Sequence, residues 1–211
     1  MSQLPALTWS RARWADAAAM LAIYNEAVAR VGQLPMVQPA SIESIQMTLR
    51  HSNRLGCPVW AYWHEDQIVG WSQIRPLNWG GASTQTTGEL SIYVGEAWHG
   101  RGVAAQAVFM AFAQSVRLGY QAMTCWILGV NQKSLQLARA CRMTRWGLLP
   151  LAAGHGDLRF DIEIWGCSLD DPDWRHHMER IQRRLEGRST GWMQERVATS
   201  TGASSSLTLP G

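Results

Sequence analysis

The sequence predicts a single mixed α/β domain that is followed by a C-terminal extension. Three observations support this prediction: a length of 211 residues, a hydrophobic content of 46%, and a central order of strand, loop, helix, strand and helix. A domain of about 150 residues removes roughly two-thirds of its chain surface from water, so this composition can form a well-buried core. Disordered and collagen-like chains are excluded, because their compositions differ from this one.

The N-terminal part of the chain contains two predicted helices, of which the first is the better marked. Asp16 is a candidate N-cap, and an alanine-rich stretch follows it. Met20, Tyr24, Ala27 and Val31 recur at three- and four-residue spacing and form one apolar face. The expected elements are a helix over 16–30, a helix over 41–52, strands over 57–64 and 67–75, and a loop over 78–87.

The central part of the chain begins with a strand over 89–94 whose residues alternate cleanly between two faces. Its side chains divide into Leu90, Ile92 and Val94 on one face and Glu89, Ser91 and Tyr93 on the other. The elements expected after it are a helix over 102–118, a strand over 122–128, a helix over 131–142, and strands over 146–149 and 158–165.

Residues 171–211 form an extension to the predicted domain of residues 1–170. A helix is expected over 173–185, within an amphipathic segment of residues 171–188, because four apolar side chains share one helical face. These side chains are Trp174, Met178, Ile181 and Leu185. Exposing such a stripe is costly, so we expect it to dock on its own domain or across a dimer. Residues 189–211 are rich in Ser, Thr and Gly and are expected to be disordered.

Charge and cysteine usage exclude several classes of function. The net charge of +3 is spread along the chain without a basic cluster, which argues against nucleic acid as a partner. No apolar run approaches the ~20 residues of a membrane span, and the N-terminus has no secretory signal. The four cysteines show no metal-binding spacing, so we expect packed, reduced thiols, no metal and a cytoplasmic location.

Gly100 and Gly102 lie in the loop between the 89–94 strand and the long helix that follows. Glycines let the backbone turn so that several N–H groups point at one spot. The start of the helix adds unpaired N–H donors and the positive end of its dipole. Together these features suit a phosphate or pyrophosphate, although Gly-x-Gly by itself is more typical of a plain tight turn.

Several ordered motifs around this loop resemble the GNAT superfamily of N-acetyltransferases, and within it the phosphinothricin and methionine sulfone acetyltransferase group. The family's pyrophosphate motif is Gln/Arg-x-x-Gly-x-Gly/Ala, and residues 99–104 read His-Gly-Arg-Gly-Val-Ala. The other matching segments are 22–25 (Ala-Ile-Tyr-Asn), 69–72 (Val-Gly-Trp-Ser), 89–94 (Glu-Leu-Ser-Ile-Tyr-Val) and 131–135 (Asn-Gln-Lys-Ser-Leu). The resemblance covers about residues 8–167.

The resemblance implies a fold and a cofactor site. The fold is a central mixed, mostly antiparallel sheet, flanked by helices, with a V-shaped split between its fourth and fifth strands. The split holds acetyl-CoA, which serves as co-substrate, and the Val94 amide would stabilise the oxyanion. The residues that the resemblance assigns to cofactor binding are Ile92, Tyr93, Val94, His99, Gly100, Arg101, Gly102, Val103, Ala104, Ala105, Asn131 and Ser134.

Glu89 is the candidate general base, because it matches the group's strand glutamate and lies on the polar face of its strand. The attacking amine must be neutral, and free amines have pKa values of roughly 8 to 10, so a group must accept a proton. Two alternatives stay open: Glu89 binds substrate, or it only pairs with an arginine. No serine or cysteine has a context that suggests a nucleophile, which agrees with direct attack in a ternary complex.

Three positions depart from the family pattern. Ala138 stands where many members have a tyrosine that can protonate the leaving thiolate, so water would have to take that role. His99 replaces the longer Gln or Arg. Arg142 replaces a glycine that normally adopts a left-handed conformation, so we expect modest strain or a changed helix cap there.

Two further residues are candidates for substrate binding beside Glu89. Arg75 ends its strand and can bind a carboxylate through its planar guanidinium; the alternative is a solvated surface arginine. His155 lies in a Gly-His-Gly turn that resembles one near the group's substrate pocket, and a plain turn residue is the alternative.

The expected function is acetyl transfer from acetyl-CoA to a primary amine of a small, amino-acid-like molecule, as in resistance to antibiotics or herbicides. Alternatives are acetylation of a protein or peptide amine, and a non-catalytic CoA-binding interaction module. Turnover with any amine separates the enzymes from the module. A comparison of small amines with peptides as acceptors separates the small-molecule enzyme from the protein or peptide enzyme. The family also makes a homodimer possible.

Overall fold

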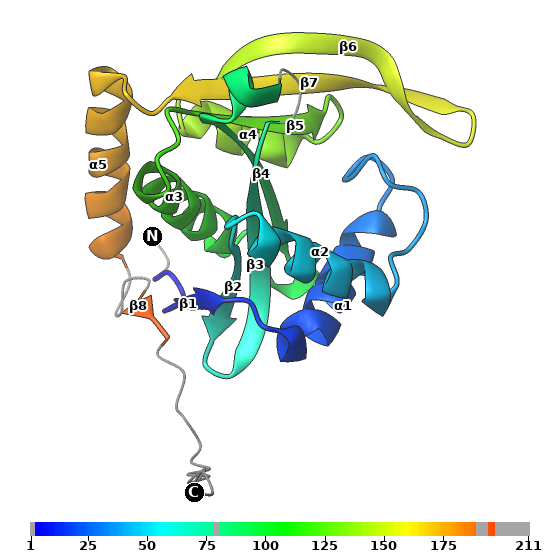
Figure 1. Cartoon of the computed structure of the whole chain (residues 1–211), viewed down its shortest axis with the longest axis horizontal. Coiled ribbons are helices and arrows are strands. Elements are labelled where there is room, and N and C mark those ends of the chain that lie inside the picture. The colour runs from blue at the N-terminus through cyan, green and yellow to red at the C-terminus, as the bar shows by residue number, and fades with distance from the viewer. Residues whose placement is uncertain (1–2, 78–80, 189–193, 197–211) are drawn as a thin grey trace, which may run out of the picture.

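The protein folds around one mixed sheet of eight strands, with helices on both of its faces (Figure 1). The computed structural model describes residues 3–77, 81–188 and 194–196. The strand order is β6-β7-β5-β4-β3-β2-β1-β8, and neighbours are antiparallel except for β4 with β5 and β1 with β8. The α/β architecture predicted from the sequence is therefore confirmed.

The elements follow the predicted order, with three strands that differ from expectation. The strands are β1 (Thr8–Arg11), β2 (Val59–His64), β3 (Gln67–Pro76), β4 (Thr87–Val94), β5 (Ala122–Leu128), β6 (Thr144–His155), β7 (Leu158–Ser168) and β8 (Gln194–Glu195). The helices are α1 (Ala17–Val28), α2 (Ile42–Arg54), α3 (Val103–Arg117), α4 (Gln132–Ala140) and α5 (Pro172–Glu186). Strands β1 and β8 were not predicted, and β6 is three times as long as the four residues expected.

Asp16 holds the N-cap position of α1 as predicted, but its side chain does not cap that helix. The Asp16 carboxylate accepts a hydrogen bond of 2.7 Å from the Arg13 N–H, so it closes the short 3-10 turn before α1. It makes no side-chain cap to α1 itself. Val31 lies beyond the helix and is 51% exposed, so it is not part of the apolar face. Helix α2 starts as predicted, with Ser41 accepting from the Ser44 N–H.

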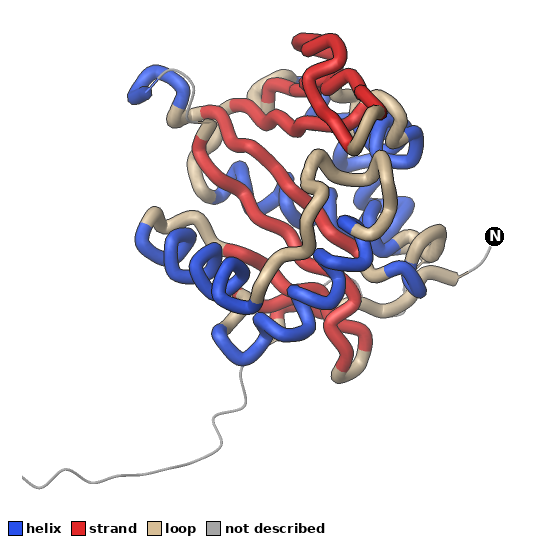
Figure 2. The backbone as a smooth tube through the Cα atoms, turned by 90° about the vertical axis from the view of Figure 1, so that its right-hand side faces the viewer, coloured by secondary structure: helices blue, strands red, loops and turns tan. Residues whose placement is uncertain are grey.

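Helices α1 and α2 cover one face of the sheet, and α3 covers the other (Figure 1). On the α1–α2 face, the Trp71 indole of β3 donates to the Met20 carbonyl at 3.1 Å. Gln73, two residues further along β3, donates to the Ser52 hydroxyl of α2 at 2.8 Å. Figure 2 turns this face toward the viewer: the helices lie in front of the lower strands, while the upper strands are in open view.

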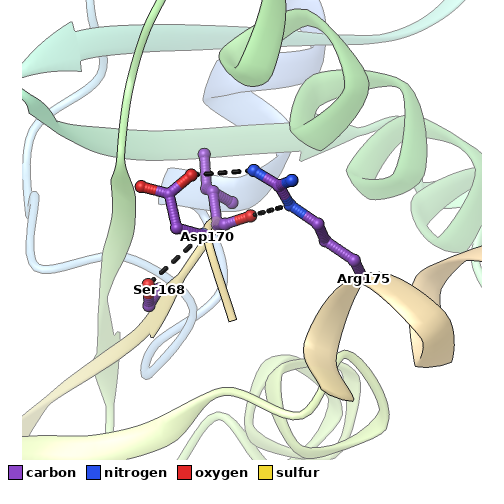
Figure 3. Close-up of polar contacts among 4 residues, drawn as sticks. Ser168, Asp170 and Arg175 are labelled. Carbon is purple, nitrogen blue, oxygen red and sulfur yellow. Dashed lines mark hydrogen bonds and ion pairs between the residues drawn. The ribbon is translucent and has the colours of Figure 1, made fainter. Parts of the chain in front are cut away.

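The predicted C-terminal helix is α5, and it packs against the domain. Trp174 is buried, meets Phe112 of α3 edge to face at 5.3 Å, and donates from its indole to the Cys141 carbonyl at 3.0 Å. Arg175 fastens the start of α5 to the end of β7 (Figure 3): it donates to the Asp170 carboxylate and the Leu169 carbonyl, both at 2.7 Å. Helix α5 therefore docks on its own domain, which is one of the two expected options.

Strand β8 corrects the expectation that residues 189–211 lack structure, although 189–193 and 197–211 lie outside the described residues. β8 pairs in parallel with β1 at the edge of the sheet. Arg196 then donates to the Trp9 carbonyl from its backbone and to the Asp66 carboxylate from its side chain, both within 2.7 Å. Its guanidinium also lies 4.7 Å from the centre of the Trp63 ring. The extension thus contacts the domain in two places: α5 packs against α3 and the segment after β7, and β8 pairs with β1.

None of the helices in the described part of the chain is long and apolar enough to cross a bilayer. Within the same residues, no three His, Cys, Asp or Glu side chains gather closely enough to hold a metal ion.

Candidate active site

The parallel strands β4 and β5 separate after a short stretch of pairing. They pair only at Thr87–Glu89 with Ala122–Thr124. Beyond this point β4 continues along β3 as far as Val94, while β5 continues along β7 as far as Leu128. The two halves of the sheet therefore diverge from each other at Glu89, which is the V-shaped split expected between the fourth and fifth strands.

Backbone polar groups of β4 face this split at every second residue. The Gly95 N–H donates to the Val69 carbonyl at 3.0 Å, so the odd-numbered residues of β4, including Tyr93, turn their backbone groups to β3. Even-numbered residues, including Ile92 and Val94, turn theirs to the side that β5 has left. The split is thus lined by strand N–H and C=O groups that can pair with an extended ligand.

The β4–α3 loop has the backbone geometry expected of an anion cradle. Gly100 and Gly102 have φ values of 75° and 83°, in the left-handed region that glycine tolerates best. Gly102 is the N-cap of α3, whose first residues are Val103, Ala104 and Ala105. The helix therefore directs its unpaired N–H groups and positive dipole end at the loop.

The two glycines differ in what an added methyl group would meet. At Gly100 a Cβ would point into open space, whereas at Gly102 it would overlap the side chain of Leu4. We expect Gly100→Ala to cost about 1–2 kcal/mol, the strain of a left-handed alanine, and Gly102→Ala to cost more because Leu4 must also move. Thermal denaturation of both variants tests this. Equal melting temperatures would show that Leu4 yields without cost.

His99 bonds to the backbone of the strand that precedes it. Its Nε2 lies 3.0 Å from the Val94 carbonyl oxygen, which makes Nε2 the protonated nitrogen of the ring. His99 therefore holds the carbonyl of Val94, the last residue of β4, whose backbone groups face the split. Arg101, two residues on, lies 5.5 Å from the centre of the Trp98 ring in the same loop.

Asn131 has a structural role that its sequence position only partly indicated. Its side-chain oxygen accepts from the Ser134 N–H at 3.2 Å and so caps α4. Its amide donates to the Gln33 carbonyl at 3.2 Å, which ties the α1–α2 loop to the end of β5. Asn131 is 8% exposed. The second contact spans 98 residues of sequence, so no local pattern could have indicated it.

Glu89 and Arg75 form an ion pair on the α1–α2 face of the sheet. They are direct cross-strand partners, and Arg75 Nη2 lies 3.0 Å from Glu89 Oε1. The side chain of Glu89 is 23% exposed and that of Arg75 is 46% exposed, so both are open to solvent beside the split. The pairing of Glu89 with an arginine, one of the alternatives considered above, is therefore present.

An aromatic cluster adjoins this ion pair on the same face. The rings of Trp71 and Tyr93 are stacked with centres 4.1 Å apart, and Tyr24 of α1 lies 5.2 Å from Tyr93. Burial raises the pKa of Tyr93 to about 12, and burial also raises the pKa of Tyr24. Both phenols are therefore neutral at physiological pH.

His155 lies apart from this arrangement. It pairs with Leu158 at the turn of the β6–β7 hairpin, whereas Glu89 lies in the middle of the sheet.

Two of the positions that depart from the family pattern lie in and after α4. Ala138 is buried in the core, and Arg142 adopts a φ of 54°, so the strained cap expected there is present. The Arg142 N–H donates to the Arg139 carbonyl and the Met143 N–H to the Ala138 carbonyl, a Schellman motif built without glycine.

Three of the four cysteines lack the low thiol pKa that a nucleophile needs. Burial raises the pKa values of Cys125, Cys141 and Cys167 to about 12, so these thiols remain protonated at physiological pH. All four cysteines are free.

Comparisons with known proteins agree with this geometry. Residues 20–142 match the Acetyltransferase (GNAT) family. The Bacillus subtilis protein named "Putative phosphinothricin acetyltransferase YwnH" is 27% identical over 164 residues, which cover 77% of this chain and 99% of that protein.

Solved structures share the fold. An N-acetyltransferase from Staphylococcus aureus Mu50 superimposes with a TM-score of 0.74 at 22% identity, covering 78% of this chain and 99% of its own. A phosphinothricin acetyltransferase from Sinorhizobium meliloti, solved in complex with AcCoA, gives a TM-score of 0.70 at 22% identity and covers 77% of this chain and 88% of its own.

Proposed function

This chain belongs to the Acetyltransferase (GNAT) family, and from that premise we propose that it transfers an acetyl group from acetyl-CoA to a primary amine of a small, amino-acid-like molecule. The observation that carries the proposal is the Glu89–Arg75 pair, 3.0 Å apart and open to solvent at the point where β4 and β5 separate. A carboxylate beside a guanidinium complements the amine and carboxylate of a free amino acid.

The residues of the split and the loop fit acetyl-CoA. Gly100 and Gly102 place no side chain at two positions of the loop, and the α3 N-terminus would supply donors for the pyrophosphate. Ile92 and Val94 offer backbone partners for the pantetheine arm. His99 and Asn131 hold the end of β4 and the start of α4 through the contacts described above, and Arg101 and Ser134 lie in the same loop and helix. The backbone of Tyr93 turns to β3, so it is not expected to pair with the arm.

Each catalytic requirement has a candidate in the chain. The Val94 N–H faces the split and would stabilise the oxyanion that develops on the thioester oxygen. Glu89 would accept the proton of the attacking amine, directly or through a water, so that nitrogen can form the new C–N bond as the C–S bond breaks. The thiolate that leaves would take a proton from water, because Ala138 has none to give. Direct attack is supported by the raised pKa values of the Cys125, Cys141 and Cys167 thiols, which are therefore not ready to form an acyl-enzyme.

Thiol release from acetyl-CoA, followed with a thiol-reactive dye, tests this proposal. The acceptors are α-amino acids, their sulfone and phosphinyl analogues, polyamines, and short peptides. We expect release that depends on amino acids or their analogues. Release with peptides alone would replace the small acceptor by a protein amine. Acetyl-CoA binding in calorimetry without release for any amine would contradict transfer to the tested classes.

A further inference from the structure

Trp146 lies on the same face of the sheet as the Glu89–Arg75 pair. The strand registers connect them in one row: Arg75 pairs with Glu89, Glu89 with Thr124, and Thr124 with Gly166. Directly opposed residues point to the same face of a sheet. A Cβ on Gly166 would run into the ring of Trp146, so the indole lies over Gly166 on that face.

The local structure of β6 directs Trp146 to this position. Arg145 opposes Trp165 and Gly147 opposes Ile164, so Trp146 is the additional residue of a β-bulge. Bulges redirect a side chain and occur often beside active sites. Gly166 completes the arrangement, because only a residue without a side chain leaves room for the ring.

Trp146 is 50% exposed although it is among the largest apolar side chains of the protein. Helices α1 and α2 pack on this face against β2 and β3, and in Figure 2 neither helix lies in front of the upper strands. Three interstrand spacings, roughly 14 Å, separate the backbones at Arg75 and Gly166. The Arg75 guanidinium contacts Glu89 at one end of this span, and the Trp146 indole covers Gly166 at the other. An acceptor bound over Glu89 would therefore lie between these two side chains.

We propose that Trp146 is a specificity-determining residue that packs against the apolar side chain of the acceptor, while Arg75 binds its carboxylate. This inference rests on the proposed function and narrows its substrate class to α-amino acids with an apolar side chain of several carbon atoms. Small amino acids such as glycine and alanine are poor acceptors, since they leave the indole in water. Apolar contacts of this kind discriminate by about 10–200-fold per methylene group in a fitted pocket.

The test compares kcat/KM for leucine and alanine, which present the same amine and carboxylate, in thiol-release assays. We expect the leucine-to-alanine ratio to fall about tenfold or more in Trp146→Ala and to fall less in Trp146→Phe. Gly166→Ala keeps the indole but displaces it, and should lower the ratio in the same direction. This variant keeps the test valid if Trp146→Ala does not fold.

Leu148→Ala is the matched control, because Leu148 is also exposed on β6 but opposes Glu163 on the other face of the sheet. Its ratio should equal that of the wild type. Suppose the wild type acetylates both amino acids and the leucine-to-alanine ratio is unchanged in Trp146→Ala and Gly166→Ala. Trp146 then does not determine specificity, while the proposed function stands. If the wild type acetylates neither amino acid nor any analogue but does acetylate peptides, both proposals fail together.

Discussion

Glu89→Gln is expected to lower kcat/KM for the amine about 10²–10⁴-fold at neutral pH, which is the usual contribution of a general base. Glutamine keeps the size of the side chain and can still accept a hydrogen bond from Arg75, 3.0 Å away, but it cannot take a proton. The loss should diminish as pH rises through roughly 8 to 10, because the acceptor amine then becomes neutral without help. Rate profiles from pH 6 to 10 measure this.

Arg75→Gln separates proton transfer from substrate binding. It removes the other member of the pair, and because Arg75 is 46% exposed the lost ion pair should change stability by less than about 1 kcal/mol. We expect a raised KM for amino acids and an unchanged KM for analogues without a carboxylate. If Glu89→Gln behaves like Arg75→Gln, with a raised KM but an unchanged kcat and pH profile, then Glu89 binds substrate and is not the base.

Trp174→Ala is expected to destabilise the protein by about 3–5 kcal/mol, the usual result of removing a large buried aromatic side chain. At this chain length that corresponds to a fall in melting temperature of roughly 6–20 °C. Trp174 is 5% exposed, contacts Phe112 of α3, and satisfies the Cys141 carbonyl just beyond α4. Thermal denaturation followed by circular dichroism measures the change.

His176→Ala is the control for this variant, because His176 lies two residues away on α5 with its side chain 66% exposed. Its stability should stay within about 0.5 kcal/mol of the wild type. If Trp174→Ala and His176→Ala have the same melting temperature, the docking of α5 does not stabilise the domain. Removal of residues 171–211 should lower the melting temperature further, because it also takes away β8 and the contacts of Arg196 with β1 and the β2–β3 turn.

Differences between prediction and structure concentrate at the edges of the sheet. Strand β1 has four residues and β8 has two, too few for an alternating pattern to stand out. Strand β6 has exposed residues along most of its length and two irregularities in register, so its alternation is broken. The central elements β4, α3 and β5 were predicted closely, because their apolar residues repeat with the period of the structure that they form.

What the sequence determined by itself is therefore local: the periods of helix and strand, the Gly100–Gly102 loop before α3, and motifs that identify the family. What only the tertiary structure decided is which side chains meet. Glu89 contacts Arg75 because β3 and β4 adopt one register, and a shift of one residue would send either side chain to the opposite face. Trp146 lies on the same face as Glu89 and Arg75 because a bulge in β6 coincides with a glycine in β7. Such pairings join segments far apart in the chain, and no repeat or spacing within one segment records them.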